Sequence, residues 1–206
     1  VALRERILDP LGLTRLELGV PEERQGGILS LQQTGAFPTP EEIRAVLGVD
    51  SLDLPEEAQL DLTFLDLPQV RAAGVPGGGA VSDAASLALF YQAVLHDPEG
   101  LWDPAVLKDA TTVIRNDLPH PLFGSATRTR GLEVAGEGPS AFYRIGGGAT
   151  SPQAFGHGGA HGQIAWADPV SGLSFAFLTN GGDQHFIREF GRGVELNALA
   201  ASSVVA

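Results

Sequence analysis

Apolar side chains recur at helical spacing in several stretches of the chain. Residues 1–8 mix apolar and charged positions in a way that fits the last turns of an amphipathic helix, which residues 9–12 end. A helix over residues 84–95 is predicted by the spacing of Leu87, Phe90, Tyr91, Val94 and Leu95. A helix after residue 183 would bury a face made of Phe186, Ile187, Phe190, Val194 and Ala198. We expect this last helix to pack on a sheet.

Polar residues predict where several helices begin and end. Thr39-Pro40-Glu41-Glu42 forms a capping box, which predicts a short helix that ends before Gly48. Ser82 is expected to be the N-cap of the helix over residues 84–95. Asp103-Pro104 predicts a similar start for a further short helix through about residue 109.

From residue 131 onward the pattern changes to short apolar or alternating runs between turn residues, which is typical of strands. The predicted strands are 131–135, 141–145, 163–167 and 173–179. The connection at 168–172 predicts a hairpin, so the last two strands should be antiparallel neighbours. Residues 111–114 are β-branched and predict a strand or an extended segment.

Two polar stretches show no periodicity. Residues 21–27 predict a polar loop, and residues 51–75 are acidic, interrupted by proline and mostly irregular, with a solvated face or flap near 50–66. The order of helical and irregular segments, then strands, then a closing helix predicts an α+β fold, an antiparallel sheet with flanking helices.

Composition narrows the function classes. The formal net charge of −12 disfavours nucleic-acid and anionic membrane partners, and no stretch approaches the roughly 20 apolar residues of a membrane span. The absence of cysteine excludes disulfides, thiolate metal sites and a cysteine nucleophile. We expect a soluble protein. The sequence does not specify its compartment, and the cytoplasm is slightly favoured. Since methionine is also absent, we expect the true beginning to lie upstream.

The segment 155–169 carries the candidate chemistry. His157 and His161 lie among glycines, and an alternating apolar run follows them. Glycine weakens a strand, so glycines beside polar side chains indicate that something must approach the backbone closely. This pattern predicts the wall of a ligand or substrate cleft. Trp166 and Trp102 are expected to be core or cleft-rim aromatics.

Several blocks of the sequence resemble the C-terminal part of the serine β-lactamase and penicillin-binding-protein-like superfamily, closest to its esterase-like, class C-like branch. Residues 6–13 resemble the helix end that follows the family's tyrosine motif, and residues 75–90 resemble a glycine-rich loop and helix of its helical region. Residues 154–181 resemble its third to fifth strands. The resemblance spans about residues 1–200 and is weakest over 22–70.

The resemblance implies that residues 1–206 are the C-terminal portion of one β-lactamase-like domain, incomplete at its N-terminus. Residues 1–130 would be mainly helical and irregular and would contain part of the family's helical region. Residues 131–206 would form the strands and the closing helix.

Enzymes of this family transfer an acyl group to a serine, which is activated by the lysine of a Ser-x-x-Lys motif. A Tyr-x-Asn motif and a strand with the sequence Lys-Thr-Gly complete the active site. The only lysine here is Lys108, and Ala105 stands three residues before it. Neither Tyr91 nor Tyr143 has asparagine two residues later. The resemblance therefore implies that both motifs lie upstream of Val1.

In the esterase-like branch His-x-Gly often replaces Lys-Thr-Gly, and here this place corresponds to His157-Gly158-Gly159. The resemblance implies that the strand runs along the substrate, which Gly158 and Gly159 help to bind. The backbone N–H of Ala160 would be one of two oxyanion-hole donors. His157 would hydrogen-bond the nucleophile region or a substrate carboxylate or carbonyl; the alternative is a structural histidine bonded to a neighbouring carbonyl. The role of His161 stays open.

Other sites are less favoured. A metal cluster of His157, His161 and His185 is disfavoured because the glycine-rich segment is not a helix and has no carboxylate close by. A self-contained Ser-His-Asp triad lacks a Gly-x-Ser-x-Gly turn. Ser82-Asp83-Ala84 is similar to the Ser-Asp-Asn of β-lactamases but begins a helix, and residues 76–79 lack the Gly-Lys-Ser/Thr of a phosphate loop.

The resemblance implies that the full-length parent is a serine hydrolase acting on a small-molecule ester or amide through an acyl-enzyme, without a cofactor or metal. An ester is preferred over a β-lactam because His157 replaces the family lysine. We expect the chain alone to be inactive and to need the missing N-terminal segment, whose strands would cover a sheet edge. The alternatives are a non-catalytic ligand-binding or regulatory relative and a truncated, inactive fragment.

Overall fold

The computed structural model describes residues 2–49, 62–120 and 124–204. Its α-helices are α1 (Pro40–Leu47), α2 (Pro68–Ala73), α3 (Ala84–His96), α4 (Pro104–Thr112) and α5 (Phe186–Ser202). Its strands are β1 (Glu17–Leu18), β2 (Gln32–Thr34), β3 (Ala80–Val81), β4 (Pro119–His120), β5 (Gly124–Ser125), β6 (Glu133–Val134), β7 (Phe155–Gly159), β8 (Gln163–Asp168), β9 (Leu173–Phe177) and β10 (Gly181–Asp183). Short 3-10 or π segments are η1 (Arg4–Leu8), η2 (Glu22–Gly27), η4 (Leu62–Asp66), η5 (Pro139–Tyr143), η6 (Ile145–Gly148) and η7 (Ala160–Gly162).

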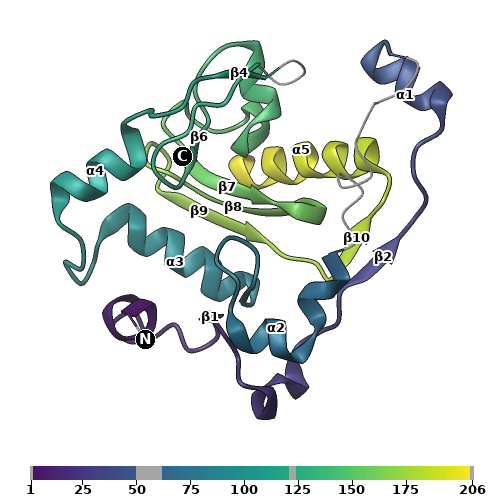
Figure 1. The fold of residues 1–206 in the computed structure, drawn as a ribbon. Helices are drawn as coiled ribbons and strands as arrows, with labels where there is room; N and C mark the ends of the chain where they lie inside the picture. The colour runs from purple at the N-terminus through teal and green to yellow at the C-terminus, as the bar shows by residue number, and fades with distance from the viewer. Residues whose placement is uncertain (1, 50–61, 121–123, 205–206) are drawn as a thin grey trace.

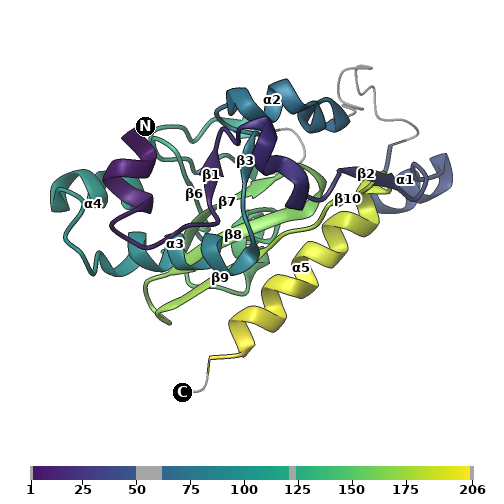
Figure 2. The same ribbon diagram turned by 90° about the horizontal axis from the view of Figure 1, so that it is seen from below.

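A four-stranded antiparallel sheet lies at the centre, in the order β6-β7-β8-β9. Figure 1 shows α3 and α5 on opposite sides of β7, β8 and β9, and Figure 2 shows the same arrangement from below. This layered antiparallel sheet with flanking helices confirms the predicted α+β fold.

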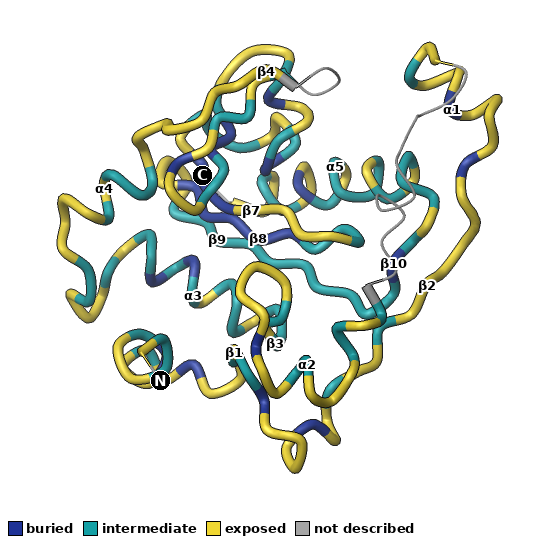
Figure 3. The backbone as a smooth tube through the Cα atoms, viewed as in Figure 1, coloured by how far each residue is buried: buried dark blue, intermediate teal, exposed yellow. Residues whose placement is uncertain are grey.

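Strand β8 supplies the core to both layers because its side chains alternate between the two faces of the sheet. Trp166 is fully buried and packs in a cluster that includes Leu196 from α5, whereas Ala165 and Ala167 pack in a cluster that includes Tyr91 from α3. The large indole therefore faces α5, and the small alanines let α3 approach closely. Figure 3 shows the buried positions concentrated along β8 and the beginning of β7.

Several predicted elements are confirmed. The capping box is present at the start of α1, where Thr39 accepts from the backbone N–H of Glu42 and the Glu42 side chain accepts from that of Thr39. The hairpin at 168–172 pairs β8 with β9 in antiparallel register. Helix α3 lies where apolar spacing predicted it.

The strand predicted at 141–145 is wrong. This stretch forms the 3-10 segments η5 and η6. Pro139 begins η5, and Gly146 and Gly147 in η6 have positive φ angles of 77° and 57°, a conformation that interrupts a strand. The apolar content of 141–145 therefore belongs to compact turns that pack against α5 and the sheet.

Three further expectations are corrected. Helix α4 ends at Thr112, so residues 111–112 are helical and do not form a strand or an extended segment. The hydroxyls of Thr111 and Thr112 donate to the carbonyls of Leu107 and Lys108, one turn earlier in the helix. The polar loop at 21–27 contains η2. Residues 50–61 lie outside the described ranges. In the rest of the stretch 51–75, which was predicted to be mostly irregular, most residues belong to the helical segments η4 and α2.

Two details of the helices also differ from the prediction. The N-cap of α3 is Asp83, whose carboxylate accepts from the Ser86 N–H at 2.8 Å, whereas the Ser82 hydroxyl donates to the Asp83 carbonyl. The predicted closing helix is present as α5, but its expected buried face is partly wrong, since Ala198 is exposed and Phe190 is 38% exposed. Leu196, Asn197 and Ala200 contact the sheet cluster instead.

Strand β10 pairs in parallel with β2, which ties the early part of the chain to the region after the central sheet. No helix within the described ranges is long and apolar enough to cross a membrane.

Candidate active site

Strand β7 is paired on both edges at its beginning but on only one edge at its end. β8 pairs with its full length, whereas β6 pairs only with Phe155 and Gly156. Within the described part of the chain, no strand covers the second edge at His157, Gly158 and Gly159, and all three residues are exposed. The backbone groups of this segment that point away from β8 can therefore bond to a ligand that extends the sheet.

The glycines of β7 serve different purposes. A Cβ at Gly156 would lie 2.2 Å from the carbonyl oxygen of Ala165, and a Cβ at Gly159 would lie 2.8 Å from the Cβ of Gln163, so both are required by the pairing with β8. A Cβ at Gly158 would meet no described heavy atom within 4 Å. The chain's own packing does not require glycine at Gly158, and its missing side chain leaves space over one face of the sheet beside the unpaired edge.

The imidazole of His157 is held by two neighbours. Its Nδ1 lies 2.5 Å from the carbonyl oxygen of Gly158, and its Nε2 lies 3.1 Å from Nη1 of Arg128. Nη2 of Arg128 lies 3.9 Å from Oε1 of Glu133, and the other Glu133 oxygen accepts from the backbone N–H of Ile145 at 3.0 Å. Sequence analysis missed Arg128, because it lies in a stretch without periodicity.

The turn after β7 is η7, which begins with the exposed Ala160 and includes His161 at a φ of 58°. A Cβ at Gly182 in β10 would lie 2.4 Å from Nδ1 of His161, so the ring packs directly on that glycine. Burial raises the pKa of Glu189 in α5, although the nearby His161 and Arg192 lower it in part. The turn that carries Ala160 is thus fixed between β10 and α5.

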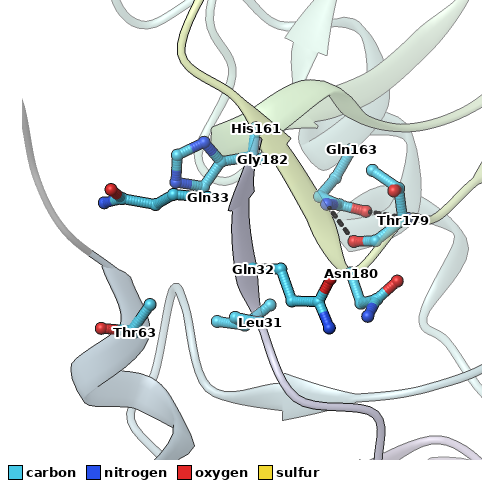
Figure 4. A pocket seen from close by; sticks show the side chains of 9 residues that line it. All are labelled: Leu31, Gln32, Gln33, Thr63, His161, Gln163, Thr179, Asn180 and Gly182. Atoms are coloured by element: carbon cyan, nitrogen blue, oxygen red, sulfur yellow. Dashed lines mark hydrogen bonds between the residues drawn. The ribbon is translucent and has the colours of Figure 1, made fainter. Parts of the chain in front are cut away.

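His161 also lines a small cavity together with Gln33, on β2, and Thr63. Figure 4 shows its ring beside Gln33, with Gln163 and Thr179 hydrogen-bonded to each other on one side of the cavity. The volume of about 10 Å³ holds no more than about one water molecule. This cavity is too small for a substrate, so the open edge of β7 is the better candidate for binding.

The other residues considered from the sequence lie in structural settings. Tyr91 is buried in α3, and burial raises its pKa to about 12. His185 caps α5, where its Nδ1 accepts from the Arg188 N–H and its Nε2 lies 3.3 Å from Glu42. In the ranges that the structure describes, no group of three or more histidine or acidic side chains could hold a metal ion. Trp166 belongs to the core.

The sequence matches the family model for Beta-lactamase over residues 1–200. The chain belongs to the β-lactamase family. This match confirms the resemblance to the serine β-lactamase and penicillin-binding-protein-like superfamily. A search of curated proteins finds no match.

Solved structures show the same fold. A penicillin-binding protein homolog from Caulobacter crescentus is similar to 97% of this chain, with a TM-score of 0.66 and 25% identity. EstA from Arthrobacter nitroguajacolicus Rue61a is similar to 98% of it, with a TM-score of 0.65 and 20% identity. The matched regions make up 52% and 54% of those two chains, so this chain spans about half the length of each.

Proposed function

We propose that the protein containing this chain is a serine hydrolase that acts on a small-molecule ester or amide through an acyl-enzyme. The observation that carries the proposal is the open edge of β7 at His157, Gly158 and Gly159, which leads directly to Ala160. Membership of the β-lactamase family supports the reaction class, and the space beside Gly158 supports the binding of a ligand along the strand.

In this proposal the substrate lies along the open edge, with its reacting carbonyl at the end of β7. A serine hydroxyl attacks the carbonyl carbon, its proton passes to the activating base, and the carbonyl oxygen becomes an oxyanion. The N–H of Ala160 donates to that oxyanion because the η7 turn fixes the backbone at this point. The leaving group departs with a proton, and water then hydrolyses the acyl-enzyme to release the acid.

The nucleophile belongs to a Ser-x-x-Lys motif upstream of residue 1. The sequence supports this part of the proposal because its single lysine, Lys108, has Ala105 at the position where the motif requires serine. Residues 1–206 then form the C-terminal portion of one domain, with the helical and irregular part at 1–130 and the sheet and closing helix at 131–206. The active protein needs the upstream segment.

We favour an ester over a β-lactam because His157 stands where the family lysine is expected, as in the esterase-like branch. The exposed imidazole hydrogen-bonds the nucleophile region or a polar group of the substrate in this proposal. Gly158 and Gly159 present their backbone to the acyl side. No cofactor is required.

The proposal is tested in a protein that joins these residues to an upstream segment carrying Ser-x-x-Lys. His157→Ala should lower kcat/KM for p-nitrophenyl butyrate by at least about tenfold, because the polar contact beside the reacting group is lost. The thermal unfolding midpoint should stay unchanged, since the ring is exposed. His96→Ala, at the end of α3, is the matched control and should retain activity. Unchanged turnover in His157→Ala would assign a structural role to His157.

A further inference from the structure

The side chain of Arg128 lies at the beginning of the open edge of β7 and contacts the candidate histidine. Its backbone is fixed although it lies outside a regular strand, since its N–H donates to the Asn116 carbonyl at 2.8 Å and its carbonyl accepts from the Asn116 N–H at 3.0 Å. The side chain is 47% exposed. A fixed backbone with a partly exposed side chain is the setting of a residue that reaches into a site.

The contact between Arg128 and His157 specifies which ring nitrogen carries the proton. A guanidinium has only donors and keeps its charge in proteins, so Nε2 of His157 must be the acceptor of the 3.1 Å contact. A neutral imidazole that accepts at Nε2 carries its proton on Nδ1. Nδ1 lies 2.5 Å from the Gly158 carbonyl oxygen, which can only accept. Both contacts therefore require the same tautomer.

The charges around the ring agree with this assignment. Arg128 is the cation beside His157, and its guanidinium can donate to the ring only through an unprotonated Nε2. Glu133 is the acidic group on this side, but its nearest oxygen lies 3.9 Å from Arg128, and its other oxygen accepts from the backbone of Ile145. The positive charge at this end of β7 thus stands on Arg128.

We propose that Arg128 is a positioning residue that selects the Nδ1–H tautomer of the neutral His157 ring and supplies a permanent positive charge at the open edge of β7. Both ring nitrogens are engaged in this state, so His157 is not a general base here. A hydrogen bond from the ring to the nucleophile region or the substrate replaces one of these two contacts. A lysine at position 157 would itself carry the positive charge. In this chain Arg128 carries the charge and His157 supplies the ring. The role of the Arg128–His157 contact in turnover rests on the proposed function. The assignment of the His157 tautomer does not.

The tautomer can be measured on this chain by two-bond proton–nitrogen NMR correlation of the histidine side chains at about pH 8, where an ordinary imidazole is neutral. His157→Gln identifies the signals of His157. We expect Nε2 to show the nitrogen shift of an unprotonated acceptor and Nδ1 that of a protonated donor. An Nε2–H pattern in the unaltered chain would overturn the proposal, whatever the variants do.

Arg128→Met keeps most of the apolar stem and removes every donor. It should move His157 part of the way towards the Nε2–H tautomer, since the Gly158 carbonyl still accepts from Nδ1–H. Arg128→Lys, which retains a charged donor, should restore the Nδ1–H pattern at least in part. Arg130→Met is the matched control, since Arg130 is on the same segment and pairs with Asp109 at 3.0 Å. If a folded Arg128→Met chain keeps the Nδ1–H pattern, Arg128 does not position the ring.

Activity separates this proposal from the proposed function. In the protein joined to an upstream Ser-x-x-Lys segment, Arg128→Met should lower kcat/KM for p-nitrophenyl butyrate by at least about tenfold, and Arg130→Met should not. The expected tautomer without any hydrolysis would contradict the proposed function and leave the assignment of His157 intact. If Arg128→Met leaves kcat/KM for p-nitrophenyl butyrate unchanged, Arg128 has no role in turnover.

Discussion

At the scale of single residues, one buried hydrogen bond joins the sheet to the closing helix. The indole N–H of Trp166 in β8 donates to Oδ1 of Asn197 in α5 at 2.8 Å. Trp166 has no exposed surface and Asn197 is 5% exposed, so water cannot replace either partner. The bond explains why a polar residue occupies the packed face of α5, where the spacing of apolar residues alone gave no reason for one.

Asn197→Ala should lower the free energy of unfolding by about 2 kcal/mol, because the buried indole N–H loses its acceptor. Denaturant titration followed by tryptophan fluorescence measures this change. Leu199→Ala is the control on the exposed face of the same helix, 68% exposed, and should change stability by less than about 0.5 kcal/mol. Equal stabilities for the two variants would show that the bond contributes nothing.

The residues of the candidate site differ in how far the sequence predicts them. His157, Gly158 and Gly159 stand out because glycines next to histidine are unusual in a strand. Arg128 has no such signal, since its contact with His157 depends on how two distant segments meet in space. The open edge itself depends on the short length of β6, which the sequence pattern predicts as longer, over 131–135.

At the scale of elements, the junction between β10 and α5 depends on one carboxylate. Asp183 ends β10, and its two oxygens accept from Nε and Nη2 of Arg188, each at 2.7 Å, while Oδ1 also accepts from the His185 N–H at 3.0 Å. The two-pronged bond from Arg188 lowers the pKa of Asp183 to about 2. The junction lies beside Gly182, on which His161 packs.

This pKa predicts a pH-dependent contribution to stability. The folded state favours the ionised carboxylate, so the contribution is complete above about pH 4, the unfolded value, and is lost as pH falls towards about 2. Asp183→Asn should lower the free energy of unfolding by about 1 kcal/mol at neutral pH, a modest value because Arg188 is 57% exposed and water screens the pair.

Urea titrations across this pH range test the effect. The difference between the unaltered chain and Asp183→Asn should shrink as the pH falls from about 4 to about 2. Asp117→Asn, an exposed position, is the control and should show little difference at any pH. A difference that stays constant down to pH 2 would contradict the assigned role of the ionised carboxylate.

Elements with strong local signals are the ones that the sequence predicts. The capping box of α1, the apolar spacing of α3 and the turn between β8 and β9 each lie within a few residues of the chain. The wrong strand at 141–145 has a suitable apolar pattern, but Pro139 and the glycines of η6 impose turns. Strands β2 and β10 are short and pair across most of the chain, so no local pattern predicts them.

At the scale of the whole molecule, an antiparallel sheet lies between α3 and α5, and within the described residues the end of its strand β7 is paired on one edge only. The β-lactamase family match extends over residues 1–200, and the chain spans about half of each similar structure. In the proposed function, β7 is the wall of the site. The proposed mechanism requires a nucleophilic serine that faces this wall.

Serine labelling with a fluorophosphonate probe, mapped by mass spectrometry, tests this account most directly. In a protein that joins residues 1–206 to an upstream Ser-x-x-Lys segment, we predict stoichiometric labelling of the motif serine and of no serine within 1–206. The 206-residue chain alone should remain unlabelled. A labelled serine within these residues would contradict the account, and a joined, folded protein without any labelling would favour a non-catalytic ligand-binding relative.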